Sequence, residues 1–152
     1  MHIGVISDTH GLLRPEAVEA LKGSKLILHA GDVGSWEVLR DLRRVAPVVA
    51  VRGNVDTADW ARWLKPVEVA EFSGLSFYIL HKLSELDLKP EAADMAAVLY
   101  GHSHRPSIEW HNGVLRFNPG SAGPRRFDLP VTVGRIRIVK GELKPEIITL
   151  FE

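Results

Sequence analysis

Acidic and imidazole side chains recur along this chain at points where short apolar runs end. The first run ends in Asp8-Thr9-His10, and the second ends in Gly31-Asp32. Carboxylates and imidazoles bind divalent transition ions, and a carboxylate can bridge two of them. Two ions about 3.5–4 Å apart can hold both oxygens of a phosphoryl transfer and acidify the water between them. We interpret the full set as metal ligands, namely Asp8, His10, Asp32, Asn54, His81, His102 and His104.

The order of these residues carries more weight than any one of them. An isolated Asp-x-His pair arises often by chance, and a lone His81 is more often a surface or core histidine than a ligand. His102 and His104 are a stronger pair, because residues two apart in an extended segment face the same side. Every member of the set follows a predicted strand, which indicates one shared site.

The elements that must position these ligands follow from the apolar pattern. In the first third of the chain, strands alternate with helices, which favours parallel pairing. We expect Ser35 to cap the second helix and Gly23 to end the first. The predicted strands are Ile3–Ser7, Lys25–His29 and Pro47–Val51, and the predicted helices are Pro15–Lys22 and Trp36–Arg44.

The remainder of the chain is predicted to be mainly antiparallel. Turn residues separate three pairs of strands, and one short strand, Val98–Tyr100, lies between the first two pairs. The sum is an α/β fold in one domain over residues 1–152, with two sheets face to face and helices outside. Ligands in open α/β sheets bind beyond the carboxyl ends of the strands. The predicted hairpins are Val67–Phe72 with Leu75–Leu80, Ser107–Trp110 with Val114–Phe117, and Val131–Val139 with Leu143–Leu150.

Composition excludes several classes of protein. Lys plus Arg and Asp plus Glu each number 19, so no bulk charge draws the chain to nucleic acid, and we expect no specific nucleic-acid partner. The absence of cysteine excludes disulfides, thiolate catalysis and thiolate metal sites. No apolar stretch approaches the roughly 20 residues of a membrane span. We therefore expect a cytoplasmic protein without a membrane partner.

The ordered motifs resemble those of a known family. Asp8-x-His10, Gly31-Asp32, Gly53-Asn54, His81 and Gly101-His102-Ser103-His104 are similar to the signature of the calcineurin-like metallophosphoesterases. The short length and Asn118-Pro119-Gly120-Ser121 resemble the small bacterial and archaeal phosphodiesterases of that family. The resemblance spans the whole chain and implies a four-layer αββα sandwich of two mixed sheets flanked by helices.

The resemblance also implies a division of the ligands between two ions. Asp8, His10, Asp32 and His104 would hold the first ion. Asp32 would bridge to the second ion, which Asn54, His81 and His102 would complete. His10, Asn54, His81 and His102 are the expected catalytic residues. Manganese is the favoured metal, with nickel, cobalt, iron, zinc and magnesium as alternatives, because such sites admit several ions.

The implied function is a metal-dependent phosphodiesterase that attacks small phosphate diesters with a hydroxide held between the ions. A nucleotide is among the candidate substrates. Two departures from the family bear on this prediction. Val55 stands where larger phosphatases carry a histidine that protonates the leaving group, so diesters with good leaving groups are favoured. Lys82 follows His81 where a glycine is common, which leaves occupancy of the second metal site open.

Other residues have two interpretations each. Asn118, Gly120 and Ser121 form a turn by composition, and they could also bind a phosphate oxygen, as could Arg126. Asp56 fits either a ligand-orienting or a turn-capping role, while His29 is expected to support the ligands rather than join them. Trp60 and Trp63 cover a core edge or form an aromatic patch for a nucleobase or a second subunit, so a homo-oligomer is also considered.

A function of another class is also compatible with this fold. The retromer scaffold subunit resembles the same family and needs only its surface to bind proteins. A scaffold has no need to keep metal ligands, whereas all seven ligand positions here have metal-binding residue types. This completeness favours an enzyme over a non-catalytic protein-binding scaffold.

Overall fold

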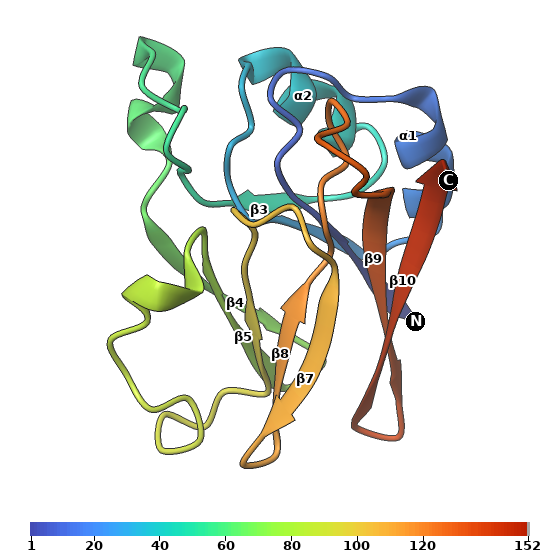
Figure 1. The fold of residues 1–152 in the computed structure, drawn as a ribbon. Coiled ribbons are helices and arrows are strands. Elements are labelled where there is room, and N and C mark those ends of the chain that lie inside the picture. The colour runs from blue at the N-terminus through green and yellow to red at the C-terminus, as the bar shows by residue number, and fades with distance from the viewer. Residues whose placement is uncertain (152) are drawn as a thin grey trace.

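Two five-stranded sheets packed face to face make up the protein, as seen in the computed structural model, which describes residues 1–151 (Figure 1). The strand order is β10-β9-β1-β2-β3 in the first sheet and β4-β5-β6-β8-β7 in the second. Each sheet mixes parallel and antiparallel pairs, as the α/β prediction requires. Glu152, the last residue of the predicted domain, lies outside the described residues.

The first sheet contains the parallel strands predicted for the first third of the chain. β1 pairs with β2 and β2 with β3 in parallel, whereas β9 is antiparallel to both of its neighbours. The three predicted strands of this region agree with the observed ones to within one residue at each end. The strands are β1 (His2–Ile6), β2 (Leu26–His29), β3 (Val48–Ala50), β9 (Val131–Val139) and β10 (Glu142–Phe151).

The second sheet has a parallel centre and antiparallel edges. The three central strands, β5, β6 and β8, run parallel to one another. At the edges, β4 pairs with β5 and β7 pairs with β8, each in an antiparallel hairpin. All three predicted hairpins are confirmed. In each turn, a residue and the glycine after it both have positive φ, as at Asn112-Gly113, which matches the twist of the flanking strands. The strands are β4 (Val67–Phe72), β5 (Leu75–Leu80), β6 (Ala97–Leu99), β7 (Ser107–His111) and β8 (Val114–Asn118).

Both α-helices lie on the side of the first sheet that faces away from the second (Figure 1). α1 (Pro15–Leu21) begins with a proline, whose ring already has a helical φ. α2 (Trp36–Arg43) buries Val38, Leu39 and Leu42 against the sheet. The expected cap by Ser35 was wrong, because its side chain makes no hydrogen bond to the helix. The buried apolar face therefore fixes α2.

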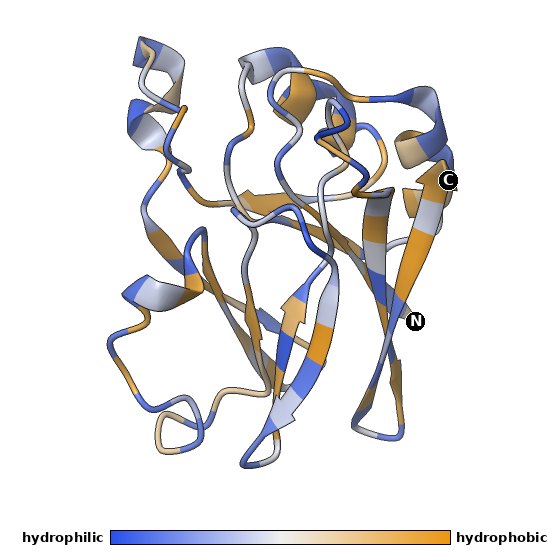
Figure 2. Cartoon of the chain, in the orientation of Figure 1, coloured by the Kyte–Doolittle hydropathy of each residue, from blue (hydrophilic) through white to orange (hydrophobic). Residues whose placement is uncertain are grey.

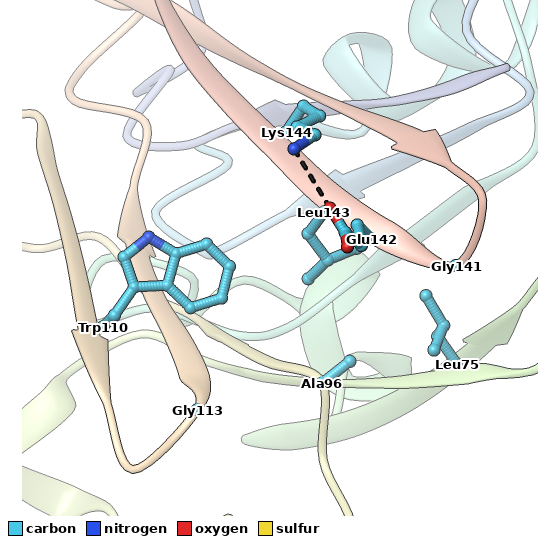
Figure 3. A pocket seen from close by; sticks show the side chains of 8 residues that line it. All are labelled: Leu75, Ala96, Trp110, Gly113, Gly141, Glu142, Leu143 and Lys144. Atoms are coloured by element: carbon cyan, nitrogen blue, oxygen red, sulfur yellow. Dashed lines mark hydrogen bonds and ion pairs between the residues drawn. The ribbon is translucent and has the colours of Figure 1, made fainter.

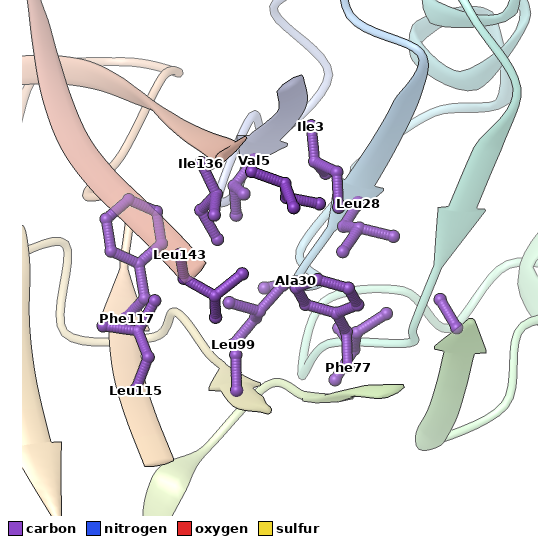
Figure 4. Close-up of a cluster of buried hydrophobic side chains, with 14 of the residues drawn as sticks. Ile3, Val5, Leu28, Ala30, Phe77, Leu99, Leu115, Phe117, Ile136 and Leu143 are labelled. Atoms are coloured by element: carbon purple, nitrogen blue, oxygen red, sulfur yellow. The ribbon is translucent and has the colours of Figure 1, made fainter. Parts of the chain in front are cut away.

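Apolar side chains from both sheets fill the space between them (Figure 4). Phe77 and Phe117 from the second sheet meet Val5 and Leu28 from the first, and all four are fully buried. Hydrophobic colour accordingly concentrates on the strands, with hydrophilic colour at many of the turns (Figure 2). This double-sided contact holds the strand ends of the two sheets in one fixed arrangement.

The outer face of the second sheet has a different cover. Tyr78, Leu80 and Tyr100 form a third apolar cluster there, against which Leu83 and Met95 pack. These two residues belong to a segment of turns that contains η2 (Leu83–Glu85), a single 3-10 turn. The segment forms the fourth layer of the predicted sandwich without an α-helix.

A second 3-10 helix, η1 (Asp59–Trp63), connects the two sheets and carries two of the tryptophans. Trp60 packs on the cluster between the first sheet and its helices, in agreement with the core-edge interpretation. Trp63 is 79% exposed and lines a surface hollow with Trp36 and Val69. A role for this hollow in oligomer formation stays a prediction. Within the described residues, no helix is both long and apolar enough to cross a membrane.

Candidate metal centre

Six strand ends meet at one end of the sandwich. β1, β2 and β3 run parallel in the first sheet, as do β5, β6 and β8 in the second. The loops that follow them are joined across the two sheets, because the amide of His102 donates a hydrogen bond to Asp8 Oδ2 at 3.1 Å. The predicted ligands thus come from five loops that are separate in sequence and adjacent in space.

Five of the seven predicted ligands form a tight cluster. Asp8 Oδ1 lies 3.4 Å from His104 Nε2 and 3.8 Å from His10 Nε2. Asp32 Oδ2 lies 3.1 Å from His81 Nε2 and 3.7 Å from His10 Nε2. Two groups of donors can each surround a cation, Asp8 with His10 and His104, and Asp8 with Asp32 and His81. Asp8 belongs to both groups, and Asp32 lies between imidazoles of both.

The other two predicted ligands lie at the rim of this cluster. His102 is exposed, and its ring packs edge-on against that of His81 with 5.3 Å between centroids. Asn54 is also exposed and lines a hollow together with His81. The rim therefore places one amide and one imidazole where solvent and a small ligand can reach the buried donors.

The hydrogen bond on the far side of the His81 ring fixes which nitrogen faces the cluster. Nδ1 of His81 lies 2.7 Å from the carbonyl oxygen of Ala30. A carbonyl can only accept, so Nδ1 carries a proton, and in the neutral ring the lone pair of Nε2 faces Asp32. Metal-binding histidines commonly use this arrangement, which orients the ring and raises its basicity.

Buried atoms without partners test whether the residues fit a metal ion. Four buried atoms of the cluster have no hydrogen-bond partner. One of them, His81 Nε2, lies 3.1 Å from Asp32 Oδ2 but makes no hydrogen bond to it. Such groups are costly to bury unsatisfied, and a divalent cation would satisfy lone pairs of this kind. The donor set therefore fits divalent metal. The atoms are Asp8 Oδ1, His10 Nε2, His81 Nε2 and His104 Nδ1.

The carboxylates of the cluster are ionised at neutral pH. Burial alone would raise the pKa of Asp32, but contact with His81 and the Val55 amide lowers it to about 2. Burial likewise opposes ionisation of Asp8, and contacts with His104 and Ser7 reverse this effect and lower its pKa. Two negative charges beside several imidazoles attract a cation.

The surroundings of the cluster shift the pKa values of its imidazoles in different directions. Burial lowers the pKa of His10 despite the opposing charges of Asp32 and Asp8. Burial also lowers the pKa of His102, and the charges of His81 and Lys82 add to this effect. For His81 the contacts with Asp32 and Ala30 outweigh burial and raise the pKa. His10 and His102 are thus held in the neutral form that binds metal.

Backbone strain concentrates at this centre. A positive φ is uncommon outside glycine and costs free energy, so its clustering marks functional sites. The sequence did not reveal this strain, since it arises where the loops are forced together. The predicted ligands with left-handed backbone are Asp8 (φ 56°), His10 (φ 48°), Asp32 (φ 54°), His102 (φ 73°) and His104 (φ 63°).

Two glycines of the motifs are required for close approach. A Cβ atom at Gly53 would overlap the backbone nitrogen and Oδ1 of Asp32. A Cβ atom at Gly101 would overlap Ser7 Oγ and lie 2.6 Å from Asp8 Oδ2. Neither glycine has a positive φ, so close packing against the ligand loops, rather than a left-handed turn, requires glycine at these positions.

Asp56 holds the loops after β2 and β3 together. Its carboxylate accepts hydrogen bonds from the amides of Val33 at 3.1 Å, Gly34 at 2.9 Å and Gly53 at 2.9 Å. The amide of Val55, in the same turn, donates to Asp32 Oδ1 at 3.0 Å. Of the two interpretations of Asp56, the turn-forming one is thus observed, and the turn in addition positions Asp32.

His29 supports the loop that carries Asp8 and His10 through a hydrogen bond to Thr9. The Gly31 amide donates to His29 Nδ1 at 3.1 Å, so the ring proton lies on Nε2, 3.0 Å from Thr9 Oγ1. Thr9 in turn donates to the Val33 carbonyl at 2.7 Å. The ring is fully buried, which lowers its pKa to about 4. His29 is therefore neutral and holds Thr9, which lies between Asp8 and His10.

The burial of His29 predicts a pH-dependent stability. The unfolded chain protonates this ring near pH 6.5, whereas the folded state does so only near pH 4. The free energy of unfolding should therefore fall as pH drops through this window, by about 1.4 kcal/mol per pH unit or about 3 kcal/mol in all. Urea titrations of chelated wild type and His29→Gln should show a shallower slope for the variant.

The matched substitution is His111→Gln at an exposed position on β7. Equal slopes for wild type and His29→Gln between pH 6.5 and 4 would contradict a neutral, buried His29.

The turn at residues 118–121 is engaged with the ligand loops. Asn118 donates to the Gly101 carbonyl and to Ser103 Oγ, both at 3.2 Å, and accepts from the Gly120 amide at 2.9 Å. Ser121 Oγ donates to the Asp8 carbonyl at 3.1 Å. This turn thus braces the metal ligands, and direct phosphate binding by its residues stays a prediction.

Several cations surround the cluster. Arg126 is exposed and close enough to His10 for its charge to act on that ring. Lys82 acts on His102 in the same way from another side.

Ser7, which donates to Asp8 Oδ2 at 2.7 Å, was not among the predicted site residues. Its place directly before Asp8, at the end of a buried strand, was the available signal.

The opposite end of the sandwich has a hollow of different character (Figure 3). It has about 420 Å³ of space, and Trp110, Leu75 and Leu143 are among its walls. Its two charged residues, Glu142 and Lys144, pair with each other at 3.2 Å. These residues offer no ligand set comparable to that at the strand ends, so the candidate chemistry lies at the metal centre.

Comparisons with known proteins agree with this geometry. A probable metallophosphoesterase of Methanothermobacter thermautotrophicus is 35% identical over an alignment that covers 97% of this chain and 92% of that protein. A solved archaeal phosphodiesterase is 26% identical with a TM-score of 0.80, over 97% of this chain and 100% of the other.

Zinc-bound Vps29 from Entamoeba histolytica has a TM-score of 0.73 at 21% identity, over 99% of each chain, which shows a shared fold. The model of the calcineurin-like phosphoesterase superfamily domain matches residues 1–141. The motifs, the fold and the clustered donors all agree with this match, and the chain therefore belongs to the calcineurin-like phosphoesterase superfamily.

Proposed function

We propose that this protein is a metal-dependent phosphodiesterase that uses two divalent ions, with manganese favoured. Family membership supports hydrolysis of phosphate esters with divalent metal, and the archaeal phosphodiesterase of the same fold supports diesters in particular. The observation that carries the proposal is that four buried side-chain atoms of the five-residue cluster have no hydrogen-bond partner. When bound, two ions would supply an acidified water and neutralise charge on the phosphate.

The residues of the chain have separable roles in this proposal. Asp8 and Asp32 would bind the positively charged metal ions. Their lowered pKa values keep both carboxylates ionised even in the acid range where the histidines begin to protonate. Asn54 and His102, at the exposed rim, would complete the ligands of the second ion together with His81, and from there they would help to stabilise the charge that develops on the phosphate oxygens. Asp56 and His29 keep these groups in place through the loops beneath.

The position of Val55 supports diesters over monoesters. Its amide holds Asp32, while its side chain is 49% exposed beside the cluster and can neither donate nor accept a proton. A leaving group that needs protonation would have no donor at this position. Aryl esters leave without a proton, so they suit such a site.

The scaffold alternative is not favoured. The likeness to Vps29 concerns the fold, and a scaffold would not need the buried, strained ligand set described above. Backbone strain at five ligand positions costs stability, which fits a site that binds metal for chemistry.

The proposal is tested by hydrolysis of bis-p-nitrophenyl phosphate and of alkyl monoesters with Mn²⁺, Ni²⁺, Co²⁺, Zn²⁺ or Mg²⁺. We expect turnover of the diester well above that of the monoesters, and loss of both after chelation. Val55→His should raise monoester turnover about tenfold or more, because general acids contribute 10²–10⁴-fold when well placed. Val55→Leu, which keeps the position apolar, is the matched control.

An unchanged preference in Val55→His would contradict the missing acid as the cause of diester selectivity. Absence of diester hydrolysis by wild type with every metal would contradict the proposed function itself.

A further inference from the structure

A shallow hollow opens directly from the candidate metal centre. It has about 360 Å³ of space, enough for one small charged group. Two of its lining residues are predicted metal ligands, so the hollow and the candidate metal centre adjoin each other. The lining residues are Arg52, Gly53, Asn54, His81, Lys82 and Glu85.

Two cations in this hollow are free to bind an anion. Several basic residues elsewhere are paired with acids, as Lys22 is with Glu19 at 2.7 Å and Arg135 with Glu146 at 3.2 Å. Over residues 1–151, neither Arg52 nor Lys82 makes a side-chain ion pair or hydrogen bond. Glu85 offsets one of the two charges, which leaves the hollow with a formal charge of +1.

The positions of the two cations fit a group beside the scissile phosphate. The buried donors cluster around Asp8 and Asp32, and only His81 of that cluster lines the hollow. A phosphate at the metal centre would leave Arg52 and Lys82 to contact whatever is attached to it. Arg can bind a phosphate through two parallel hydrogen bonds, and Lys binds it as a point charge.

We propose that Arg52 and Lys82 form a subsite for a second phosphate of the substrate. The proposal rests on the proposed function, since it assumes that the scissile diester binds at the metal centre. It narrows the substrate class to diesters that carry a further phosphate, such as nucleoside bisphosphate esters. Asn54 also lines the hollow, and its amide would offer a neutral hydrogen-bond donor there.

The sharpest test uses two substrates that differ only in the second phosphate. Thymidine 5′-(p-nitrophenyl phosphate) and its 3′-phosphorylated form release the same leaving group. Wild type with Mn²⁺ should prefer the 3′-phosphorylated form about tenfold in kcat/KM, mainly through KM, because a charge-assisted hydrogen bond contributes this much.

Variants assign the preference to the two cations. Arg52→Gln and Lys82→Gln should each reduce it to about threefold, and the double variant should abolish it, because each removes one charge from the subsite. Lys144→Gln is the matched control, because this lysine lies at the opposite end of the sandwich and should leave the preference at its wild-type value. Thermal melts establish that each variant is folded.

A binding measurement separates the subsite from catalysis. Calorimetry with Mn²⁺ should show tighter binding of thymidine 3′,5′-bisphosphate than of thymidine 5′-monophosphate, and the double variant should lose the difference. Equal affinity in wild type, or an unchanged difference in the double variant, would overturn the subsite even if diesters are hydrolysed. Normal discrimination in binding without hydrolysis of any diester would instead refute the proposed function.

Discussion

Replacing Asp32 with asparagine should lower kcat/KM for bis-p-nitrophenyl phosphate by about a thousandfold at saturating Mn²⁺. The carboxylate lies 3.1 Å from His81 and 3.7 Å from His10, so its charge serves both halves of the cluster. Asparagine keeps the shape and removes that charge, which weakens both sites at once. Asn54→Ala affects one rim position and should cost less, about tenfold to a hundredfold. Steady-state kinetics with metal titration measure both.

Asp87→Asn, at an exposed position, is the control for loss of one acidic group. If Asp32→Asn keeps nearly wild-type activity at saturating Mn²⁺, the bridging role of Asp32 is wrong. An Asn54→Ala variant that loses more than Asp32→Asn would lead to the same conclusion.

Adding Mn²⁺ to chelated protein should raise its melting temperature by at least about 5 °C. A ligand that binds only the folded state stabilises it by about 2.7 kcal/mol at a hundredfold excess over Kd. For a domain of this size, each kcal/mol shifts Tm by about 2–4 °C. Without a cation, the ionised Asp8 and Asp32 also repel each other, and metal removes this penalty.

The variant Asp8→Asn combined with His104→Ala should lose most of this shift. Asp8 Oδ1 and His104 Nε2 are 3.4 Å apart and belong to one donor group, so the pair removes one ion's surroundings. Differential scanning calorimetry with and without chelator measures the shift. If the melting temperature of wild type is the same with Mn²⁺ as with chelator, metal binding by the folded chain is refuted.

Local sequence pattern was sufficient to predict the strands and the clustering of five of the seven predicted ligands. Apolar runs and turn residues have short-range causes, so the boundaries of β1 to β3 agree to within one residue. The ligands were recognisable because each follows a strand, and parallel strands bring their carboxyl ends to one edge. The three hairpins followed from their turn residues for the same reason.

Features that depend on distant contacts could not be predicted. The left-handed backbone at Asp8 and His102 accompanies a hydrogen bond between these residues that spans 94 positions in sequence. The room needed at Gly53 is set by Asp32, which arrives from another loop. The role of Asp56 likewise required knowing which amides converge on its carboxylate. The cover of the second sheet by turns has no periodic signal, so its form was not foreseen.

The strained ligands carry an evolutionary consequence. A residue with left-handed backbone costs about 1 kcal/mol or more of folding stability relative to glycine. Five such residues therefore lower the free energy of unfolding of a domain of this size appreciably. A lineage released from metal binding would gain stability from each glycine or asparagine that drifted into these positions. Within the proposed function, aspartate and histidine at these positions cost folding stability that metal binding would have to offset.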